Sequence, residues 1–560
     1  MCLWMTLVKA TAYSMSDSGM EQPMKNFCTG LMVLMALLCM PLQAAEINAG
    51  FLGGDVPDTR LAEAAMARDM TSVQSLLREQ GADVNALGPF ETPALHWVVR
   101  VEDLETAEML LAAGADPNLA NAYDLQPLHL AIENGNAAMV ALLLVAGADP
   151  NIPDRAGENS LFLAARSGSP EIVQVILDFG ADPQQRESHF NQTPLMVAVR
   201  SGEEAVVSLL LDTHVDVNAQ TLAGEVPRMR LPSENAGSKG VGINRGGIPE
   251  RGERAPIGGA KTALLYATRQ GNLQLTRLLV EAGADLEQAD ANGVTPLINA
   301  IVNGSVVSRG GPPTGHIATA RYLINQGANV NASDWYGETP LWSAVMLRNL
   351  NVTGATRDNK VDRAAALELI RELIQAGADV NARTRESSPT QRFITRIGDL
   401  SWVDFTGQTP FLRAAFSGDI TVMKLLVDNG ADANLGTFAG TTPLMAAAGI
   451  NWVVNQTWDE GSDALLEAVK YAHSLGNDVN ARNSMGLSAM HGAANRGSND
   501  IIHYLAANGA ELDSEDKEGR TPVTWAHGVF LATHPPVDKP ETAALIEALM
   551  EERQLAQSSD

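Results

Sequence analysis

A fixed spacing of glycines constrains this chain most. Gly81, Gly114, Gly147 and Gly180 lie 33 residues apart, and each begins a short tag of the form Gly-Ala-Asp, then Val or Pro, then Asn or Gln. A constant period of this length indicates one supersecondary unit that is repeated along the chain. Such units cannot bury their apolar faces alone, so neighbouring units must stack to form a core.

The stretch from Gln126 to Gly147 shows what is repeated. Apolar residues at helical spacing on either side of Gly135 predict two short amphipathic helices. Gly147 ends the second helix, where a left-handed residue suits glycine, and the Asp-Pro-Asn that follows predicts a turn-rich finger loop. The pattern therefore predicts an all-α solenoid of helix-turn-helix units with finger loops.

These residues resemble the ankyrin repeat. Thr-Pro-Leu begins at Thr193, Thr295, Thr339 and Thr442, and the tag returns from Gly283 onward. The resemblance also covers the family histidine, which stands at His96, His129 and His491. It implies an ankyrin-repeat array of about twelve units over residues 58–553, with residues 554–560 as a tail.

Two tags depart from the pattern. His214 stands where other units have the tag glycine, and Gly476 is followed by Asn477 rather than alanine. We expect the helix ends at these two places to be distorted.

The first 57 residues lie outside the repeat. Residues 24–45 combine one basic residue, an apolar run and small residues at Ala44 and Ala45, which is typical of a signal peptide. Residues 1–23 are then an upstream extension, with Met24 as the alternative start, and residues 46–57 a linker. An uncleaved anchor is the alternative for the apolar run. All three cysteines precede residue 40, so a cleaved chain has none.

Signal cleavage predicts a periplasmic or secreted protein without stable membrane insertion. We also expect the chain to be a monomer. The net charge of −27 disfavours nucleic acid as a partner, because a polyanion repels an acidic surface.

Five insertions interrupt the repeat. They fall near 224–261, 304–317, 347–363, 383–405 and 451–463. The first four are net basic and the fifth is net acidic. Loops on a rigid scaffold are where binding residues concentrate, although neutral insertions are also tolerated at little cost. The basic charge can equally be satisfied by the acidic body of the same chain.

The segment 300–465 holds the candidate partner-binding residues. Tryptophan and arginine are enriched at interface hot spots, and five of the eight tryptophans lie here. Trp342 is expected in the core, because it falls in a helix. Bracing of the long loops is the alternative role for the others. The candidates are Trp335, Tyr336, Arg348, Arg357, Arg392, Arg396, Trp402, Asp404, Trp452, Trp458 and Asp459.

No motif predicts catalysis, a metal site or a cofactor. The glycines near 240–246 and 258–262 match neither a dinucleotide fingerprint nor a phosphate loop in spacing and context. The first hypothesis is therefore an exported scaffold that binds a protein partner through its concave face and its loop insertions. The alternative is a small-molecule-binding protein or enzyme with a pocket formed by the insertions at 300–465.

Overall fold

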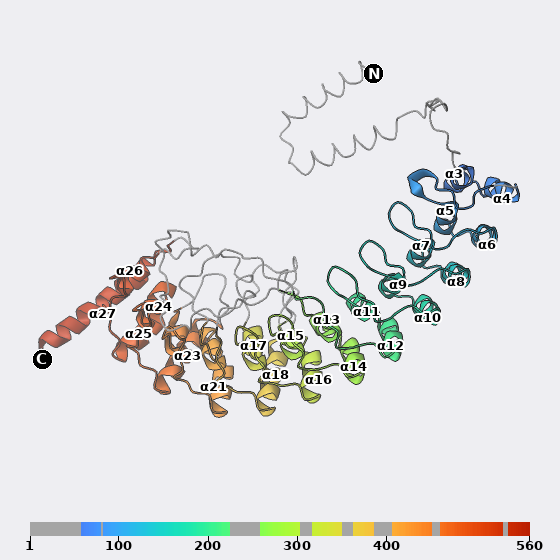
Figure 1. The fold of residues 1–560 in the computed structure, drawn as a ribbon. Helices are drawn as coiled ribbons and strands as arrows, with labels where there is room; N and C mark the ends of the chain where they lie inside the picture. Colours follow the sequence, from blue (N-terminus) through green and yellow to red (C-terminus); the bar gives the residue numbers. More distant parts are fainter. Residues whose placement is uncertain are drawn as a thin grey trace, which may run out of the picture. The chain divides into compact units, whose positions relative to one another are not determined.

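In the computed structural model, the α-helices of the described residues form an array of stacked helix pairs (Figure 1). The structure describes residues 58–79, 82–223, 258–302, 316–349, 362–385, 406–450, 460–529 and 536–559. Within these ranges there are twelve pairs of α-helices and no β-strand. The predicted all-α architecture and the predicted number of units are both confirmed.

The first helices of the twelve pairs stack on one another in chain order. They are α3 (Arg60–Met66), α5 (Ala94–Arg100), α7 (Pro127–Glu133), α9 (Ser160–Ser167), α11 (Pro194–Ser201), α13 (Ala263–Gln270), α15 (Pro296–Ile301), α17 (Pro340–Arg348), α20 (Pro410–Phe416), α22 (Pro443–Ala448), α24 (Ala489–Arg496) and α26 (Pro522–Ala526).

The second helices form a second stack beside the first. They are α4 (Met70–Arg78), α6 (Leu104–Ala112), α8 (Ala137–Val145), α10 (Pro170–Asp178), α12 (Glu204–Asp212), α14 (Leu273–Glu281), α16 (Ile317–Asn325), α18 (Arg363–Gln375), α21 (Ile420–Asp428), α23 (Ser462–Ser474), α25 (Asn499–Ala507) and α27 (Pro540–Ser559). A short 3₁₀ helix, η1 (Pro89–Glu91), lies in the first finger. Residues 554–559, predicted as a tail, continue α27.

The repeated Thr-Pro begins a first helix in a way that satisfies its free backbone. Thr193 lies just before α11, and its hydroxyl accepts from the backbone N–H of Met196 at 3.3 Å. Pro194 occupies the first helical position, where its missing N–H costs no hydrogen bond. Thr339 begins α17 in the same way.

In the described units that carry it, the tag glycine follows the second helix in left-handed backbone. Gly114 and Gly147 have φ of 96° and 95°. His214 also has a positive φ, of 60°, and Gly476 has φ 95°. The expected distortion of these two helix ends is therefore wrong, because histidine tolerates the left-handed region that the unit requires.

The tag asparagine joins each unit to the next. Asn151 donates from Nδ2 to the carbonyl of Gly180 at 2.9 Å, while its Oδ1 accepts from the backbone N–H of Asp182 at 2.7 Å. Gln184 replaces asparagine in the following unit, and its two contacts are longer, at 3.4 and 3.2 Å. The last residue of the tag thus stitches the units together.

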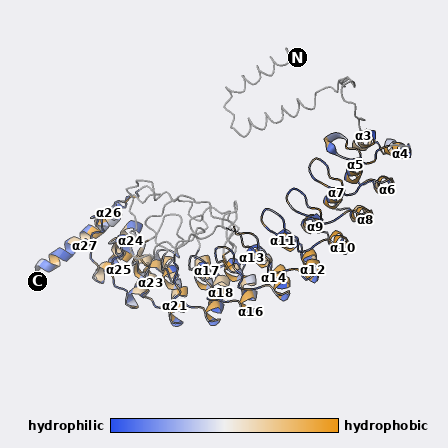
Figure 2. Cartoon of the chain, in the orientation of Figure 1, coloured by the Kyte–Doolittle hydropathy of each residue, from blue (hydrophilic) through white to orange (hydrophobic). Residues whose placement is uncertain are grey.

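The apolar core runs through the whole array. The helices of the array carry both hydrophilic and hydrophobic residues (Figure 2). One buried cluster extends from Leu61 to Ala284 and another from Leu297 to Ile546, and the half-buried Val280 packs against both. Trp342 is only 1% exposed and belongs to this core, as predicted.

The family histidines are buried and tie neighbouring units together. His96 Nε2 lies 2.8 Å from the carbonyl of Leu125, and His491 Nε2 lies 3.2 Å from that of Arg520. Burial lowers the pKa of both His96 and His491 to about 4, because the charged imidazolium is disfavoured away from water. Their predicted structural role is consistent with these contacts.

Candidate partner-binding surface

Trp335 and Tyr336 lie at the tip of a finger, the loop between the second helix of one unit and the first helix of the next. Their rings meet edge to face, with centroids 5.2 Å apart. The backbone N–H of Trp335 donates to the carbonyl of Asn292 at 2.8 Å, and the N–H of Arg385 donates to that of Tyr336 at 2.6 Å. Both side chains are half-buried. They brace the fingers and still present part of their surface to solvent.

Arg348 lies at the end of α17 in a buried ion-pair cluster. Its Nε donates to Asp419 Oδ2 at 2.8 Å, and the guanidinium also bonds the carbonyl of Arg363. Only 10% of the Arg348 side chain is exposed. The structure therefore commits this guanidinium to contacts within the chain and leaves little of it for a partner.

The remaining predicted residues lie outside the part of the chain that the structure describes. They are Arg357, Arg392, Arg396, Trp402, Asp404, Trp452, Trp458 and Asp459. Of the five predicted insertions, the structure describes only the ends.

Several neighbouring finger tips are joined by single backbone hydrogen bonds. Each bond runs from the N–H of one tip to the carbonyl of the tip before it. Such bonds join Ser188 to Ala156, Leu222 to Phe190, Trp335 to Asn292, Phe438 to Thr406, and Lys517 to Met485, at 2.8–3.3 Å. The bonds hold successive tips in a fixed order, so side chains on them form a preorganised surface.

Exposed aromatic side chains gather on the finger tips, both on tips joined by these bonds and on the first two fingers. Phe90 is 65%, Phe190 62% and Tyr123 59% exposed, and Phe438 and Leu222 are also exposed. Among the described residues, Phe179 is the one other exposed aromatic, and it lies at the end of α10. Aromatic side chains that stay exposed in the described part of the chain are typical of an interaction surface.

Sequence reasoning missed these finger aromatics because it searched for clustered tryptophans. For Tyr123 the available signal is positional. Tyr123 follows the turn residue Asn121 by two positions, and Tyr336 follows Asp334 by the same interval. The side-chain oxygens of Asn121 and Asp334 accept from the backbone N–H of Tyr123 and Tyr336, both at 2.9 Å. An aromatic residue at this position is held at a tip, away from the core.

Phe90 adopts a backbone conformation that is unfavourable for an aromatic residue. Its φ and ψ are 62° and 30°, in the left-handed region that favours glycine. A bulky residue with positive φ is uncommon and points to a functional constraint. Phe90 is also the most exposed aromatic of the described residues, so core packing does not require a phenylalanine here.

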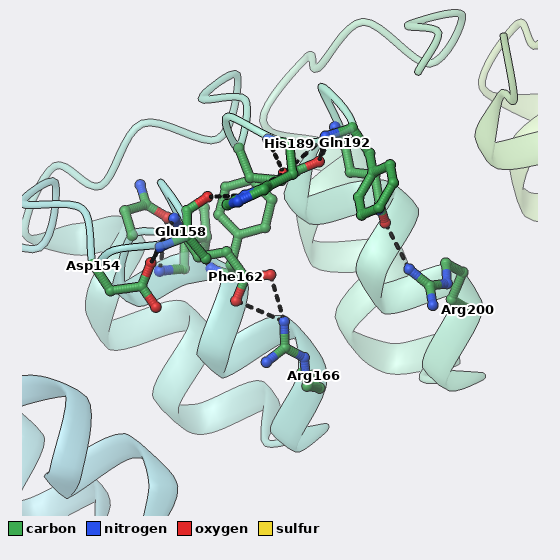
Figure 3. Close-up of polar contacts among 12 residues, drawn as sticks. Asp154, Glu158, Phe162, Arg166, His189, Gln192 and Arg200 are labelled. Carbon is green, nitrogen blue, oxygen red and sulfur yellow. Dashed lines mark hydrogen bonds and ion pairs between the residues drawn. The ribbon is translucent and has the colours of Figure 1, made fainter. Parts of the chain in front are cut away.

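Buried Glu187 fixes the finger that carries Phe190. Its carboxylate accepts from the backbone N–H groups of His189, Phe190 and Gln192 at 2.7–3.0 Å. Figure 3 shows this finger beside the first helices that support it. A carboxylate that accepts from three backbone N–H groups within four residues leaves the tip little freedom to move.

Two arginines on first helices form hydrogen bonds with the finger that precedes each helix. Arg166 on α9 donates to both carboxylate oxygens of Glu158 at 2.6 Å, and Arg200 on α11 donates to Gln192 Oε1 at 2.7 Å (Figure 3). In each pair the arginine lies eight residues after its partner. Long side chains in a helix point back toward its N-terminus, which allows this reach.

Neither metal binding nor membrane crossing finds support in the described ranges. They contain no group of three or more His, Cys, Asp or Glu side chains that could hold a metal ion. Within the same ranges, no helix combines the length and the apolar character needed to cross a bilayer.

Family models for ankyrin repeats match most of the array. A model described as "Ankyrin repeats (3 copies)" matches residues 61–154, 128–221 and 460–529. Models described as "Ankyrin repeat" match residues 261–291, 336–385 and 406–435. Together these matches cover more than half of the chain.

Curated relatives match parts of the array. Human neurogenic locus notch homolog protein 1 is 31% identical over 175 residues, which are 31% of this chain and 6% of that protein. Alpha-latrocrustotoxin-Lt1a of Latrodectus tredecimguttatus is 28% identical over 123 residues, 22% of this chain and 8% of the toxin. The chain thus spans less than a tenth of the length of these relatives.

Among solved structures, the ankyrin repeat domain of Bcl-3 matches with 22% identity and a TM-score of 0.35, over 52% of this chain and 100% of that chain. Stacked helix pairs joined by fingers define the class of protein as a helical repeat solenoid. The family matches make the identification specific: the chain belongs to the ankyrin-repeat proteins. This fold is typically a non-catalytic scaffold for protein interactions.

Proposed function

We propose that this protein is an exported ankyrin-repeat scaffold that binds a protein partner. The binding surface is the face formed by the first helices and the finger tips, which the sequence analysis expects to be concave, together with the loop insertions. One observation carries the proposal: exposed aromatic side chains recur on the finger tips, and backbone hydrogen bonds hold several of these tips, including that of Phe190, in order. A preorganised surface of this kind loses little conformational entropy on binding.

A matched pair of variants tests the surface. Replacing Phe90, Tyr123 and Phe190 by serine removes three finger aromatics, whereas Val145→Ser with Phe179→Ser removes exposed apolar groups at the ends of second helices. Proteins that co-purify with the wild-type chain from an envelope fraction are quantified for both variants. We expect the finger variant to lose a specific partner that the second-helix variant retains. Equal retention of every co-purifying protein by both variants would refute the surface.

Export has its own test, because it rests on residues 24–45. We expect N-terminal sequencing of the protein recovered from its host to begin close to Glu46. Recovery from the cytoplasm with Met1 or Met24 at the N-terminus would refute export while leaving the binding surface untouched.

A further inference from the structure

Three arginines occupy the same position in consecutive first helices. Arg166 of α9, Arg200 of α11 and Arg269 of α13 all lie in the last turn, and all three are exposed. Neighbouring first helices contact each other. Because packed helices lie about 8–10 Å apart, the three side chains form a row with about that spacing.

Two members of this row have no carboxylate partner among the described residues. Arg166 is neutralised by Glu158. Arg200 instead donates to the neutral amide of Gln192, and its guanidinium carbon lies 5.6 Å from the centre of the Tyr266 ring. The Arg269 guanidinium makes no hydrogen bond or ion pair with any residue in the described ranges, although its backbone carbonyl lies 3.1 Å from His316 Nε2.

This pairing pattern is unexpected in so acidic a chain. Acidic residues outnumber basic ones by 66 to 39. The nearby carboxylate of Glu187 is held by three backbone N–H groups. Arg200 and Arg269 therefore form a local positively charged site beside the aromatic ring of Tyr266. Guanidinium groups bind carboxylates through two parallel hydrogen bonds, and Arg and Tyr are enriched at interface hot spots.

We propose that the Arg200–Tyr266–Arg269 cluster binds an acidic, extended segment of the protein partner. The proposal rests on the function proposed above and names the chemistry of the partner. In an extended polyproline II segment, which has three residues per turn and rises about 3.1 Å per residue, carboxylates three residues apart lie on one face about 9 Å apart. This distance matches the spacing of the two arginines. The segment therefore carries Asp or Glu at every third position, so that its carboxylates face the two arginines.

Synthetic peptides test the spacing. The probe is a fluorescein-labelled peptide with glutamate at every third position and leucine and serine between. One control peptide has the same composition with its glutamates clustered at one end, and another has glutamine in place of glutamate. Fluorescence anisotropy with the purified protein should show tightest binding by the spaced peptide, weakening as sodium chloride is raised.

Matched variants test the site. Arg200→Gln with Arg269→Gln should weaken binding of the spaced peptide about tenfold, as expected for two carboxylate contacts worth somewhat under 1 kcal/mol each. The control is Arg277→Gln with Arg371→Gln on second helices, which changes the net charge equally. Arg277 stacks on Tyr322 at 5.4 Å, as Arg200 does on Tyr266. We expect less than about a twofold effect from the control.

Three results would overturn the inference: equal binding of the spaced and clustered peptides, equal weakening by both variant pairs, or competition by inorganic phosphate at concentrations similar to the peptide. In each case partner loss on removing Phe90, Tyr123 and Phe190 would still support the scaffold function. The two proposals can thus fail separately. Unchanged circular dichroism spectra and melting curves of the variants exclude misfolding as the cause.

Discussion

The side chain of Asn118 forms hydrogen bonds with the backbone of both Gly147 and Asp149 in the next unit. Its Nδ2 donates to the carbonyl of Gly147 at 2.9 Å, and its Oδ1 accepts from the N–H of Asp149 at 2.7 Å. Asparagine carries a donor and an acceptor on one short planar group, and alanine or aspartate would lose one or both bonds. The asparagine of the repeated tag is thus a bridge between units.

Replacing Asn118 tests this bridge. We expect Asn118→Ala to lower the free energy of unfolding by about 1–2 kcal/mol, because it removes two hydrogen bonds. Asn118→Gln should recover only part of the loss, since Gln184 makes longer contacts at the equivalent position. Urea denaturation followed by circular dichroism measures both. An unchanged midpoint for Asn118→Ala would show that water replaces the bridge at no cost.

Asp419 neutralises a cluster of arginines and caps α21. Its Oδ2 accepts from Arg348 at 2.8 Å, and Arg363 lies 3.8 Å away. Burial lowers the pKa of Arg413 to about 10, which attraction by Asp419 partly opposes. Asp419→Asn keeps the cap and removes the charge. We expect it to lower the unfolding free energy by about 3 kcal/mol, because the arginines then lack a buried counter-charge.

The control for this charge is Asp216→Asn. Asp216 is exposed and lies 3.9 Å from Arg186, so its replacement should change stability by less than about 0.5 kcal/mol. Thermal unfolding of both variants measures the contrast. A similar small effect for Asp419→Asn would mean that solvent screens the arginine cluster.

Periodicity made the fold predictable, because each unit repeats the same local solutions. Thr193 followed by Pro194 predicts the start of a first helix, and a glycine such as Gly147 predicts the end of a second helix. His214 shows the limit of that reasoning. It was expected to distort a helix end, but the left-handed conformation depends on the surrounding unit, which tolerates histidine there.

The candidate site was less predictable. Residue type alone favours the tryptophans as binding residues. The exposure of an aromatic side chain, however, depends on its position in the finger. Trp335 is half-buried by its neighbours, while Phe190 projects from a tip that the buried Glu187 holds. The type of a charged residue does not predict whether it forms an ion pair. Arg348 forms one with Asp419, but Arg269 has no carboxylate partner among the described residues.

Asp334 should make stability depend on pH. Burial raises the pKa of this carboxyl to about 7, and the nearby charge of Asp290 adds to the shift. A carboxyl with a raised pKa in the folded state holds its proton more tightly there than in the unfolded chain. Its contribution is therefore fully present near pH 4 and is lost as the pH rises through 7.

Asp334→Asn should remove this dependence without disturbing the finger. Asn121 and Asn483 occupy the equivalent position in other fingers and accept the same pair of backbone N–H groups. We expect the variant to match the wild type near pH 4 and to exceed it at pH 8 by at least about 1 kcal/mol. Asp334→Ala, which loses both hydrogen bonds, should be less stable than Asp334→Asn at every pH. A stability difference between Asp334→Asn and wild type that stays constant from pH 4 to 8 would contradict the burial argument.

Variants of Phe90 should change partner binding without lowering the stability of the protein. Glycine adopts a φ near 62° without steric cost, whereas a residue with a Cβ is strained there. We therefore expect Phe90→Gly to melt no lower than the wild type and to bind the captured partner at least about fivefold more weakly, because the exposed ring is lost. Phe90→Ala should weaken binding equally but remain about 1 kcal/mol less stable than Phe90→Gly, since alanine keeps the strain. Differential scanning calorimetry and surface plasmon resonance measure the two quantities. A large fall in the melting temperature of both variants would instead place Phe90 among the residues that stabilise the first finger, and undiminished partner affinity would remove it from the binding surface.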